Sequence, residues 1–247
     1  TARDKAAAHL AAGAKRVVSV DLNRHMRPKL LLACAQRLGQ CVTQIAKAVD
    51  GDVEEIRARH ARMLEKLTTS GNLAAATDGV VEYHAPMDAT RTGFAENQFD
   101  CIFSNSVLEH VPPDVIDAMY VEALRILDAN GVMFHSVNCG DHYAYVDRSI
   151  HQLHYLRYSD AQWTRWNNAF LYQNRMRAHV FVERAEDLGF QILLNTAKPS
   201  ELRMQQLAST PVHAQFAGIP PERLCITSVD FIARKIGRSD PAIADVA

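Results

Sequence analysis

The sequence predicts an α/β fold in which helices flank a mainly parallel sheet. Short β-branched runs alternate with longer segments of helical periodicity. The spacing between these runs is that of βαβ units. A chain of 247 residues is long enough for one sizeable domain with a buried core. We therefore expect a single domain over residues 1–247, whose ligands bind at the carboxyl ends of its strands.

The first part of the chain is expected to run helix, strand, helix, helix. Residues 6–12 are rich in alanine and favour a helix. Residues 16–21 are a β-branched run that ends in an acid, which is typical of a strand entering a loop. Apolar positions then recur at helical spacing over 28–49 and over 53–67. A turn at 50–52 separates these two amphipathic helices.

The middle of the chain adds three strands and one helix. Residues 80–83 and 99–103 are short runs of strand formers. Pro112 opens a helix that runs to about Leu127. A turn at 128–131 leads into a strand at 132–137. Two further strands and a loose tail complete the chain, at residues 191–194, 225–233 and 237–247.

Composition and charge are those of an ordinary globular protein. Hydrophobic residues make up 48%, and 27 basic side chains are balanced by 28 acidic ones, so nothing favours a nucleic acid partner. No apolar stretch approaches the roughly 18 residues of a membrane span. The five cysteines are odd in number and form no Cys-x-x-Cys pair, which favours a reducing compartment. We expect a cytoplasmic protein, and its oligomeric state is left open.

Four short sequence segments occur in an order and at a spacing that are typical of one enzyme family. They are VVSVD ending at Asp21, MDA at 87–89, FDCIFSNSVLEHV at 99–111 and ALRILDANG at 123–131. Together they resemble class I S-adenosylmethionine-dependent methyltransferases, specifically the methyltransferase type 11 group, over about residues 6–137. The resemblance implies a Rossmann-like sheet with helices on both faces, S-adenosyl-L-methionine as the cofactor, and methyl transfer to a small-molecule acceptor.

The resemblance also implies which residues hold the cofactor. Asp21 matches the strand-end acid that accepts from both ribose hydroxyls, and Asp88 matches the acid that accepts from the adenine amino group. The loop at 104–106 matches the segment that runs beside the methionine part. Each residue also has a plainer reading as a turn former or cap. The expected cofactor-binding set is Asp21, Leu22, Met87, Asp88, Ala89, Ser104, Asn105, Ser106 and His110.

One part of the family pattern is absent from this sequence. The glycine-rich loop should precede the ribose acid by about 20 residues, yet Thr1–Asp4 contains no glycine. The resemblance places the missing first strand in the middle of the sheet, where its loss leaves two strand edges unpaired. We expect that upstream residues or a partner supply that strand.

The acceptor is expected to bind the segment at 139–182, which mixes histidines, acids and aromatic residues. His142 follows a strand end and has Asp141 beside it, so the two are the candidate catalytic residues, with His142 as general base. The alternative is a histidine that shapes the pocket without taking a proton. Positioning alone also suffices for many methyl transfers. The expected acceptor-binding residues are Tyr143, Trp163, Asn174 and Arg175.

Several readings compete with this one. The histidines and acids of residues 141–154 lack the spacing of an established zinc motif, so no metal is expected. The preferred acceptor atom is an oxygen of a sugar, glycan or secondary metabolite, with nitrogen and carbon left open. A methyltransferase-like binding or scaffolding subunit is the main alternative. A nicotinamide-dependent reductase is disfavoured by the pieces at 87–89 and 99–111. Within the single domain, residues 24–72 are expected to form a helical insertion.

Overall fold

The computed structural model describes residues 13–168 and 172–236. The chain forms two compact units, Thr1–Thr92 and Gly93–Ala247, and each is described by itself. The helix expected at 6–12 and the tail at 237–247 lie outside the described residues. The single-domain organisation, with its helical insertion, stays a prediction.

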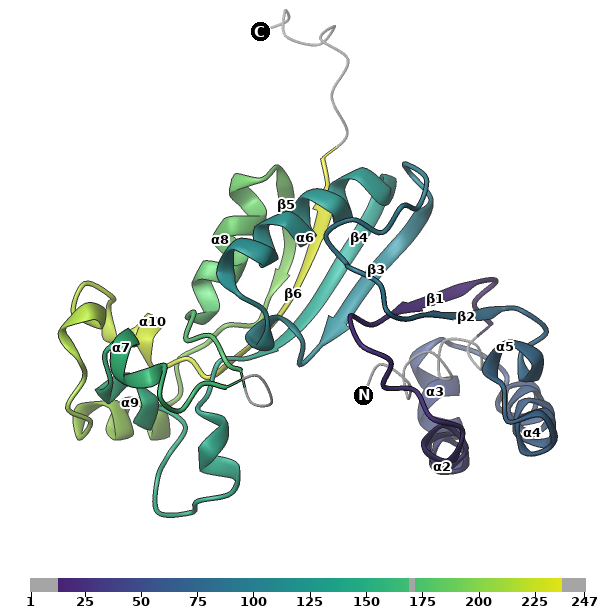
Figure 1. Cartoon of the computed structure of the whole chain (residues 1–247), viewed down its shortest axis with the longest axis horizontal. Coiled ribbons are helices and arrows are strands. Elements are labelled where there is room, and N and C mark those ends of the chain that lie inside the picture. The colour runs from purple at the N-terminus through teal and green to yellow at the C-terminus, as the bar shows by residue number, and fades with distance from the viewer. Residues whose placement is uncertain (1–12, 169–171, 237–247) are drawn as a thin grey trace, which may run out of the picture. The chain divides into compact units, whose positions relative to one another are not determined.

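The first unit combines a two-stranded parallel sheet with a group of helices (Figure 1). Strand β1 (Val17–Val20) pairs with β2 (Val81–His84). Buried apolar side chains from both strands and from the helices form its core, among them Leu31, Met63 and Val81. The helices are α2 (Pro28–Leu38), η1 (Gly39–Cys41), α3 (Val42–Ala48), α4 (Val53–Ser70) and α5 (Leu73–Ala76).

Local sequence explains where these helices begin and end. Pro28 occupies the first turn of α2, and the Asp52 side chain caps α4 by accepting from the Glu55 backbone N–H. The helix predicted at 28–49 is interrupted at Gly39, which the periodicity did not indicate. A Cβ added to Gly39 would lie 3.0 Å from His60 Cε1, so α4 approaches the chain closely at this point. Helix α5 was not predicted.

The second unit contains a four-stranded sheet in the order β3-β4-β6-β5. Strands β3 (Phe99–Asn105), β4 (Leu127–Asn138) and β5 (Phe190–Asn195) run in one direction, and β6 (Ser228–Lys235) runs in the other. The α/β class is therefore confirmed, with β6 as the exception to the parallel arrangement. The turn expected at 128–131 lies inside β4, where the register against β3 jumps from Leu127 to Val132.

The strands form two sheets, where one had been expected. Within the described residues, β1 pairs with β2 alone and β3 pairs with β4 alone, so each has one free edge. The missing first strand that the resemblance implies stays a prediction.

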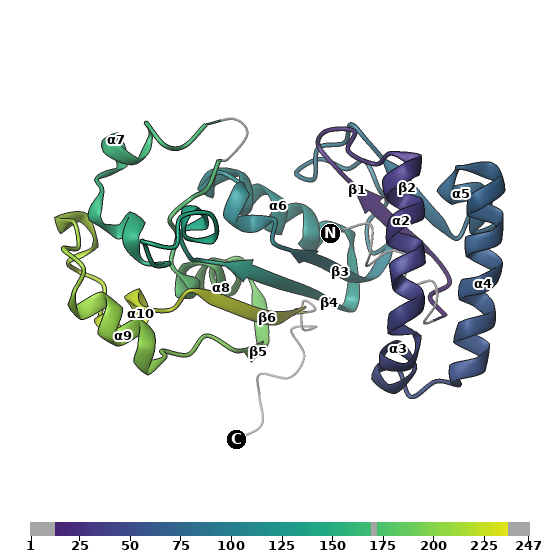
Figure 2. The same ribbon diagram turned by 90° about the horizontal axis from the view of Figure 1, so that it is seen from below.

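Helices α6 (Pro113–Ile126) and α8 (Ala178–Asp187) lie on the same face of the second unit's sheet (Figures 1 and 2). Their apolar residues pack with Met133 and Val137 of β4 in one buried core. This packing fixes the carboxyl ends of β3 and β4 in space. The shorter helices are η2 (Leu108–His110), η3 (His142–Tyr145), η4 (His154–Arg157), α7 (Asp160–Trp163), α9 (Glu201–Ala208), η5 (Ala214–Phe216) and α10 (Pro221–Leu224).

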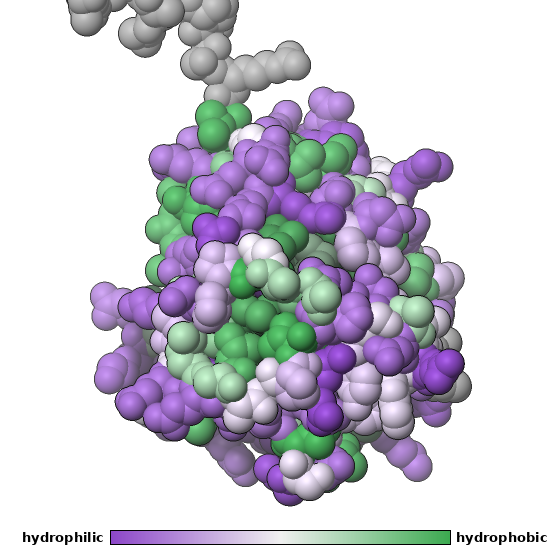
Figure 3. Space-filling model, turned by 90° about the vertical axis from the view of Figure 1, so that its left-hand side faces the viewer, coloured by the Kyte–Doolittle hydropathy of each residue, from purple (hydrophilic) through white to green (hydrophobic). Residues whose placement is uncertain are grey.

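Apolar side chains also reach the surface of this unit. Figure 3 shows them gathered in a patch surrounded by polar residues, on the face that carries α7, α9 and α10. None of the helices in the described parts of the chain is both long and apolar enough to cross a bilayer.

Candidate functional site

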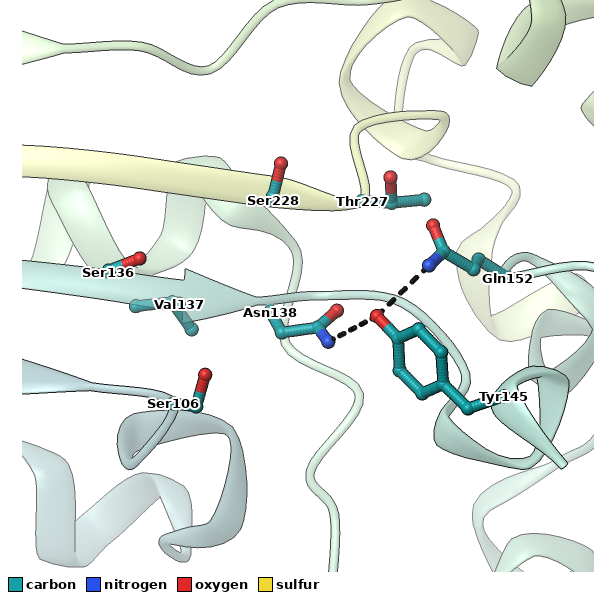
Figure 4. Close-up of a pocket in the computed structure, with 8 residues that line it drawn as sticks. All are labelled: Ser106, Ser136, Val137, Asn138, Tyr145, Gln152, Thr227 and Ser228. Atoms are coloured by element: carbon teal, nitrogen blue, oxygen red, sulfur yellow. Dashed lines mark hydrogen bonds between the residues drawn. The ribbon is translucent and has the colours of Figure 1, made fainter. Parts of the chain in front are cut away.

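A polar pocket of about 270 Å³ opens beside the carboxyl ends of β3 and β4 (Figure 4). Seven of its eight lining residues carry a hydroxyl or an amide, and Val137 is the single apolar one. The pocket therefore lies at the end of the sheet where the strand-end rule expects a ligand. The lining residues are Ser106, Ser136, Val137, Asn138, Tyr145, Gln152, Thr227 and Ser228.

Tyr145 stands at the centre of a fixed hydrogen-bond network in this pocket (Figure 4). Its phenolic oxygen accepts from Asn138 Nδ2 at 2.7 Å and from Gln152 Nε2 at 3.1 Å. The other ends of the two amides are also held, because Asn138 Oδ1 accepts from the Gly140 N–H and Gln152 Oε1 accepts from Arg203. Both lone pairs of the Tyr145 oxygen are thus used. Its own proton remains available for a group in the pocket.

The backbone of two loops brings these side chains together. Ser106 follows β3 with φ at +52°, a left-handed conformation that lets its N–H donate to the Ser136 carbonyl at 2.8 Å. After β4, the Asp141 carboxylate accepts from the Tyr143 N–H and caps η3. Helix η3 then places the rings of His142 and Tyr145 with their centroids 5.7 Å apart.

A second group of polar side chains lies next to the pocket. Glu109, His110 and His142 each offer one nitrogen or carboxylate oxygen within 4.8 Å of the others. The two imidazole rings meet edge to face, with centroids 5.0 Å apart. Nδ1 of His110 is 2.7 Å from the Tyr172 carbonyl oxygen. Sequence reasoning had named His110 and His142 but had left Glu109 out of the site.

The Glu109 carboxylate is the most deeply buried member of this group, with 1% of the residue exposed. Burial raises its pKa, while its own backbone N–H, the charge on His110, the Asn138 N–H and the Ser106 hydroxyl act in the opposite sense. Ser106 and Asn138 are near enough to favour the charged form, but neither carboxylate oxygen receives a hydrogen bond of acceptable geometry. Both oxygens of the Glu109 carboxyl are therefore buried without a hydrogen-bond partner among the described residues.

The predicted catalytic pair does not form as expected. Burial, and then the charge on His110, lower the pKa of His142 to about 4, so His142 is neutral at pH 7 but a weak base. The Asp141 carboxylate is fully buried and turns toward the Tyr143 N–H and His154, whose Nδ1 is 3.6 Å away. Burial raises the pKa of Asp141 to about 6. Asp141 therefore holds η3 and does not orient the His142 ring.

In the first unit, Asp21 has the surroundings expected of a ribose-binding acid. It follows β1 directly, and its Oδ2 accepts from the Tyr83 hydroxyl at 2.8 Å. No other group among the described residues donates to this carboxylate. Leu22 is 69% exposed, and the Met87 N–H donates to the Asp21 carbonyl at 2.9 Å. The ends of β1 and β2 thus present one acid with open acceptor capacity.

Asp88 is partly used by its own turn. Its Oδ1 accepts from both the backbone N–H and the hydroxyl of Thr90, at 2.8 and 2.7 Å. These bonds lower the pKa of Asp88. The other carboxylate oxygen accepts no hydrogen bond from the described residues, and Ala89 is the next residue in the sequence.

The remaining cofactor candidates lie in the second unit. Ser104 is hydrogen bonded to His135 Nδ1 at 2.7 Å, which ties its hydroxyl to the sheet. Asn105 is half-buried at the end of β3. Ser106 lines the pocket, and His110 belongs to the neighbouring cluster. These four residues belong to the second unit, whereas Asp21 belongs to the first.

The predicted acceptor-binding residues use their polar groups inside the protein. The Tyr143 hydroxyl donates to the Trp166 carbonyl at 2.8 Å, and the Trp163 indole donates to the Gln173 carbonyl at 3.1 Å. Asn174 donates from one amide to the carbonyls of Leu108 and Val111. Arg175 is buried, binds the carbonyls of Tyr155 and Tyr158, and pairs with Asp160. These contacts give all four a structural role, and their part in binding an acceptor stays a prediction.

Sequence reasoning missed Tyr145 and Gln152. No local pattern in the sequence singles out a tyrosine on the short helix that follows β4. Gln152 enters because its side chain reaches back from a later loop. Only the tertiary structure supplies that contact.

Comparison with known proteins fits these observations. Residues 59–135, about a third of the chain, match the family model described as a methyltransferase domain. The match covers three of the four sequence pieces in whole or in part, and it confirms the resemblance to type 11, S-adenosyl-L-methionine-dependent methyltransferases. None of the curated protein sequences compared is significantly similar to this chain.

Solved structures with similar architecture include three methyltransferases. One is a SAM-dependent methyltransferase from Methanosarcina mazei, with 15% identity, a TM-score of 0.48, and coverage of 93% of this chain and 86% of that one. Another is the 1,6-didemethyltoxoflavin-N1-methyltransferase of Burkholderia thailandensis with S-adenosylhomocysteine, with 14% identity, a TM-score of 0.40 and coverage of 66% and 54%.

The third is the geranyl diphosphate C-methyltransferase of Streptomyces coelicolor A3(2) with Mg²⁺, geranyl diphosphate and S-adenosyl-L-homocysteine. It has 13% identity, a TM-score of 0.40 and coverage of 74% and 61%. At these identities and TM-scores the likeness does not extend to the acceptor.

Proposed function

We propose that this chain, whose residues 59–135 match a methyltransferase domain, transfers a methyl group from S-adenosyl-L-methionine to an oxygen of a small hydroxylated molecule. Methyl transfer with this cofactor follows from the family match. The acceptor and the receiving atom are inferred from the pocket beside β3 and β4.

The cofactor would be held by residues that end strands. Asp21 would accept from the ribose, Asp88 and Ala89 would meet the adenine, and the loop at 104–106 would run beside the methionine part. Asp21 fits this task because a single internal donor occupies its carboxylate. When bound, S-adenosyl-L-methionine supplies a methyl group already activated by its sulfonium.

The lining of the pocket supports a hydroxylated acceptor. None of its eight residues is charged, so nothing there would attract an ammonium group, and a single apolar residue offers little to a hydrocarbon. Hydroxyls and amides match the alternating donors and acceptors of a sugar, a glycan or a hydroxylated secondary metabolite. The Tyr145 hydroxyl is the single observation that carries this proposal, because it lines the pocket, accepts from two held amides and donates to no acceptor among the described residues.

His142 contributes position in this proposal. Its low pKa argues against strong general-base catalysis at neutral pH. Since the methyl group is already activated, holding the acceptor oxygen in line supplies much of the acceleration.

The test is to incubate the full chain with methyl-labelled S-adenosyl-L-methionine and matched panels of polyols, phenols, amines and prenyl diphosphates. We expect label in a hydroxylated acceptor, and NMR of the product should place the methyl group on oxygen. Label on nitrogen or carbon would refute the acceptor proposal alone. Absence of both cofactor binding and transfer would favour a non-catalytic subunit.

A further inference from the structure

The buried Glu109 carboxyl has no hydrogen-bond partner among the described residues. It sits on η2 directly after β3 with both oxygens inaccessible and without a hydrogen bond. Burying a carboxylate unpaired costs several kcal/mol in general. The two side chains that face it, His110 and His142, could offset this as cations or as neutral ligands of a shared cation.

The hydrogen bond of His110 fixes the orientation and the neutral tautomer of its ring. A carbonyl oxygen only accepts, so His110 Nδ1 must donate its proton to Tyr172 at 2.7 Å. In the neutral ring this leaves the lone pair on Nε2, where it can bind a cation. An imidazole held through one nitrogen by a backbone carbonyl, with the other nitrogen open, is the arrangement found in metal-ligating histidines.

His142 presents a second open nitrogen to the same space. Its Nε2 is buried and has no hydrogen-bond partner, and its ring packs against His110. One potential ligand atom from each of Glu109, His110 and His142 lies within 4.8 Å of the other two. Ligands of a transition-metal ion lie roughly 3.0 to 3.5 Å apart, given bonds of about 2.1 Å, so modest side-chain movement would close the site.

We propose that Glu109, His110 and His142 bind one divalent transition-metal ion. Two imidazoles and one carboxylate suit Zn²⁺, Fe²⁺, Co²⁺ or Mn²⁺, whereas Mg²⁺ and Ca²⁺ prefer all-oxygen sites. Three protein ligands leave at least one coordination position open. The set comes from two loops, after β3 and after β4, so no local sequence spacing could reveal it.

The open position lies beside the acceptor pocket. Glu109 is close to Ser106 and Asn138, which line that pocket, and the His142 ring is next to Tyr145. A hydroxyl bound to the ion would release its proton to solvent more readily, because the cation lowers the pKa of the hydroxyl. That role rests on the proposed function, whereas binding of the ion does not.

Metal binding is tested on the full chain, stripped with a chelator and then titrated with Co²⁺. Calorimetry gives stoichiometry and affinity, and visible d–d absorption reports on the ligands. We expect one ion per chain. Glu109→Gln, His110→Gln and His142→Gln should each weaken binding at least about 100-fold, since loss of a partner beyond the ligands already costs 10- to 100-fold.

His179→Gln is the matched control, because His179 is a half-buried histidine on α8, and it should bind Co²⁺ as the wild type does. Circular dichroism checks that each variant is folded. If the Glu109 variant does not fold, His142→Gln still tests the proposal, because His142 is less buried than Glu109. Failure of the wild type to bind Co²⁺ would overturn the proposal, as would unchanged affinity in a folded His142→Gln. No cofactor or acceptor is present, so this result is independent of the methyl-transfer assay.

Discussion

Two stretches of the second unit have a similar mixture of aromatic and polar residues but use it differently. In residues 163–177, as far as they are described, the indole, amide and guanidinium groups bind backbone carbonyls and an acid. In residues 138–152, the Tyr145 proton and the His142 Nε2 lack an internal partner. Their composition predicted that both stretches bind the acceptor. Their hydrogen bonds differ, because the polar groups of residues 163–177 are bonded inside the protein. Polar groups left open, rather than polar groups as such, indicate the site.

The largest expected effect tests the structural stretch. Arg177 is 1% exposed and donates to the carbonyls of Cys139 and Ile226 and to the Tyr155 hydroxyl. Arg177→Met would leave the Ile226 carbonyl unpaired, at about 1 to 3 kcal/mol for a buried group, and would remove the charged donor from the Cys139 carbonyl and the Tyr155 hydroxyl, which still bond to each other. We expect the free energy of unfolding to fall by about 3 kcal/mol in urea denaturation. A loss below about 1 kcal/mol would contradict a structural role.

The next prediction concerns pH and a histidine held inside the sheet. Burial lowers the pKa of His135 to about 4 in the folded chain, against about 6.5 when unfolded. Between these values the unfolded chain binds more protons, so the free energy of unfolding falls as pH falls from 6.5 toward 4. From pH 7 to pH 5, His135 alone should account for on the order of 2 kcal/mol.

His135→Asn isolates this contribution. Denaturation of both proteins at pH 7 and pH 5 gives the two losses, and the variant should lose less. His142, His151, His154 and His179, whose pKa values are also lowered, remain in both proteins and cancel. Equal losses in the two proteins would show that His135 is not held neutral.

Asp21 extends the comparison to the first unit, because its carboxylate can accept further hydrogen bonds beyond the one from Tyr83. A carboxylate that accepts two ribose hydroxyls contributes about 1.5 to 3 kcal/mol. Asp21→Ala should therefore weaken S-adenosyl-L-methionine about tenfold or more, measured by calorimetry. Unchanged affinity would remove Asp21 from the cofactor site.

Much of the fold followed from local patterns. β-branched runs and other short runs of strand formers indicated all six described strands; apolar periodicity gave the start of α4, and the prolines at 112–113 gave that of α6. The close contact between Gly39 and His60 was not predictable in this way, because His60 lies on another helix. For the candidate site, the sequence predicted which loops take part, namely those that follow strands.

Individual side chains in those loops were not predictable in the same way. Arg175 was expected to grip the acceptor because no local pattern shows that Asp160 and two carbonyls occupy it. Tyr145 was overlooked for the converse reason. Its orientation is set by Asn138 and Gln152, which tertiary packing brings to it.

The smallest expected effect is on stability, and it comes from a matched pair of tyrosines. The Tyr143 hydroxyl donates to the Trp166 carbonyl, so Tyr143→Phe should lower the free energy of unfolding by about 1 kcal/mol. It should leave acceptor kinetics unchanged. Thermal denaturation and steady-state kinetics measure the two effects. A raised KM for the acceptor would return Tyr143 to the acceptor site.

The most direct test of the account is the same change at Tyr145. Its proton is assigned to the acceptor, and a lost hydrogen bond of about 1 to 1.5 kcal/mol corresponds to roughly a tenfold weaker interaction. Tyr145→Phe should therefore raise the KM for the hydroxylated acceptor about tenfold, with the affinity for S-adenosyl-L-methionine unchanged. An unaltered KM in Tyr145→Phe, or a KM raised equally in Tyr143→Phe, would contradict the placement of the acceptor beside β3 and β4.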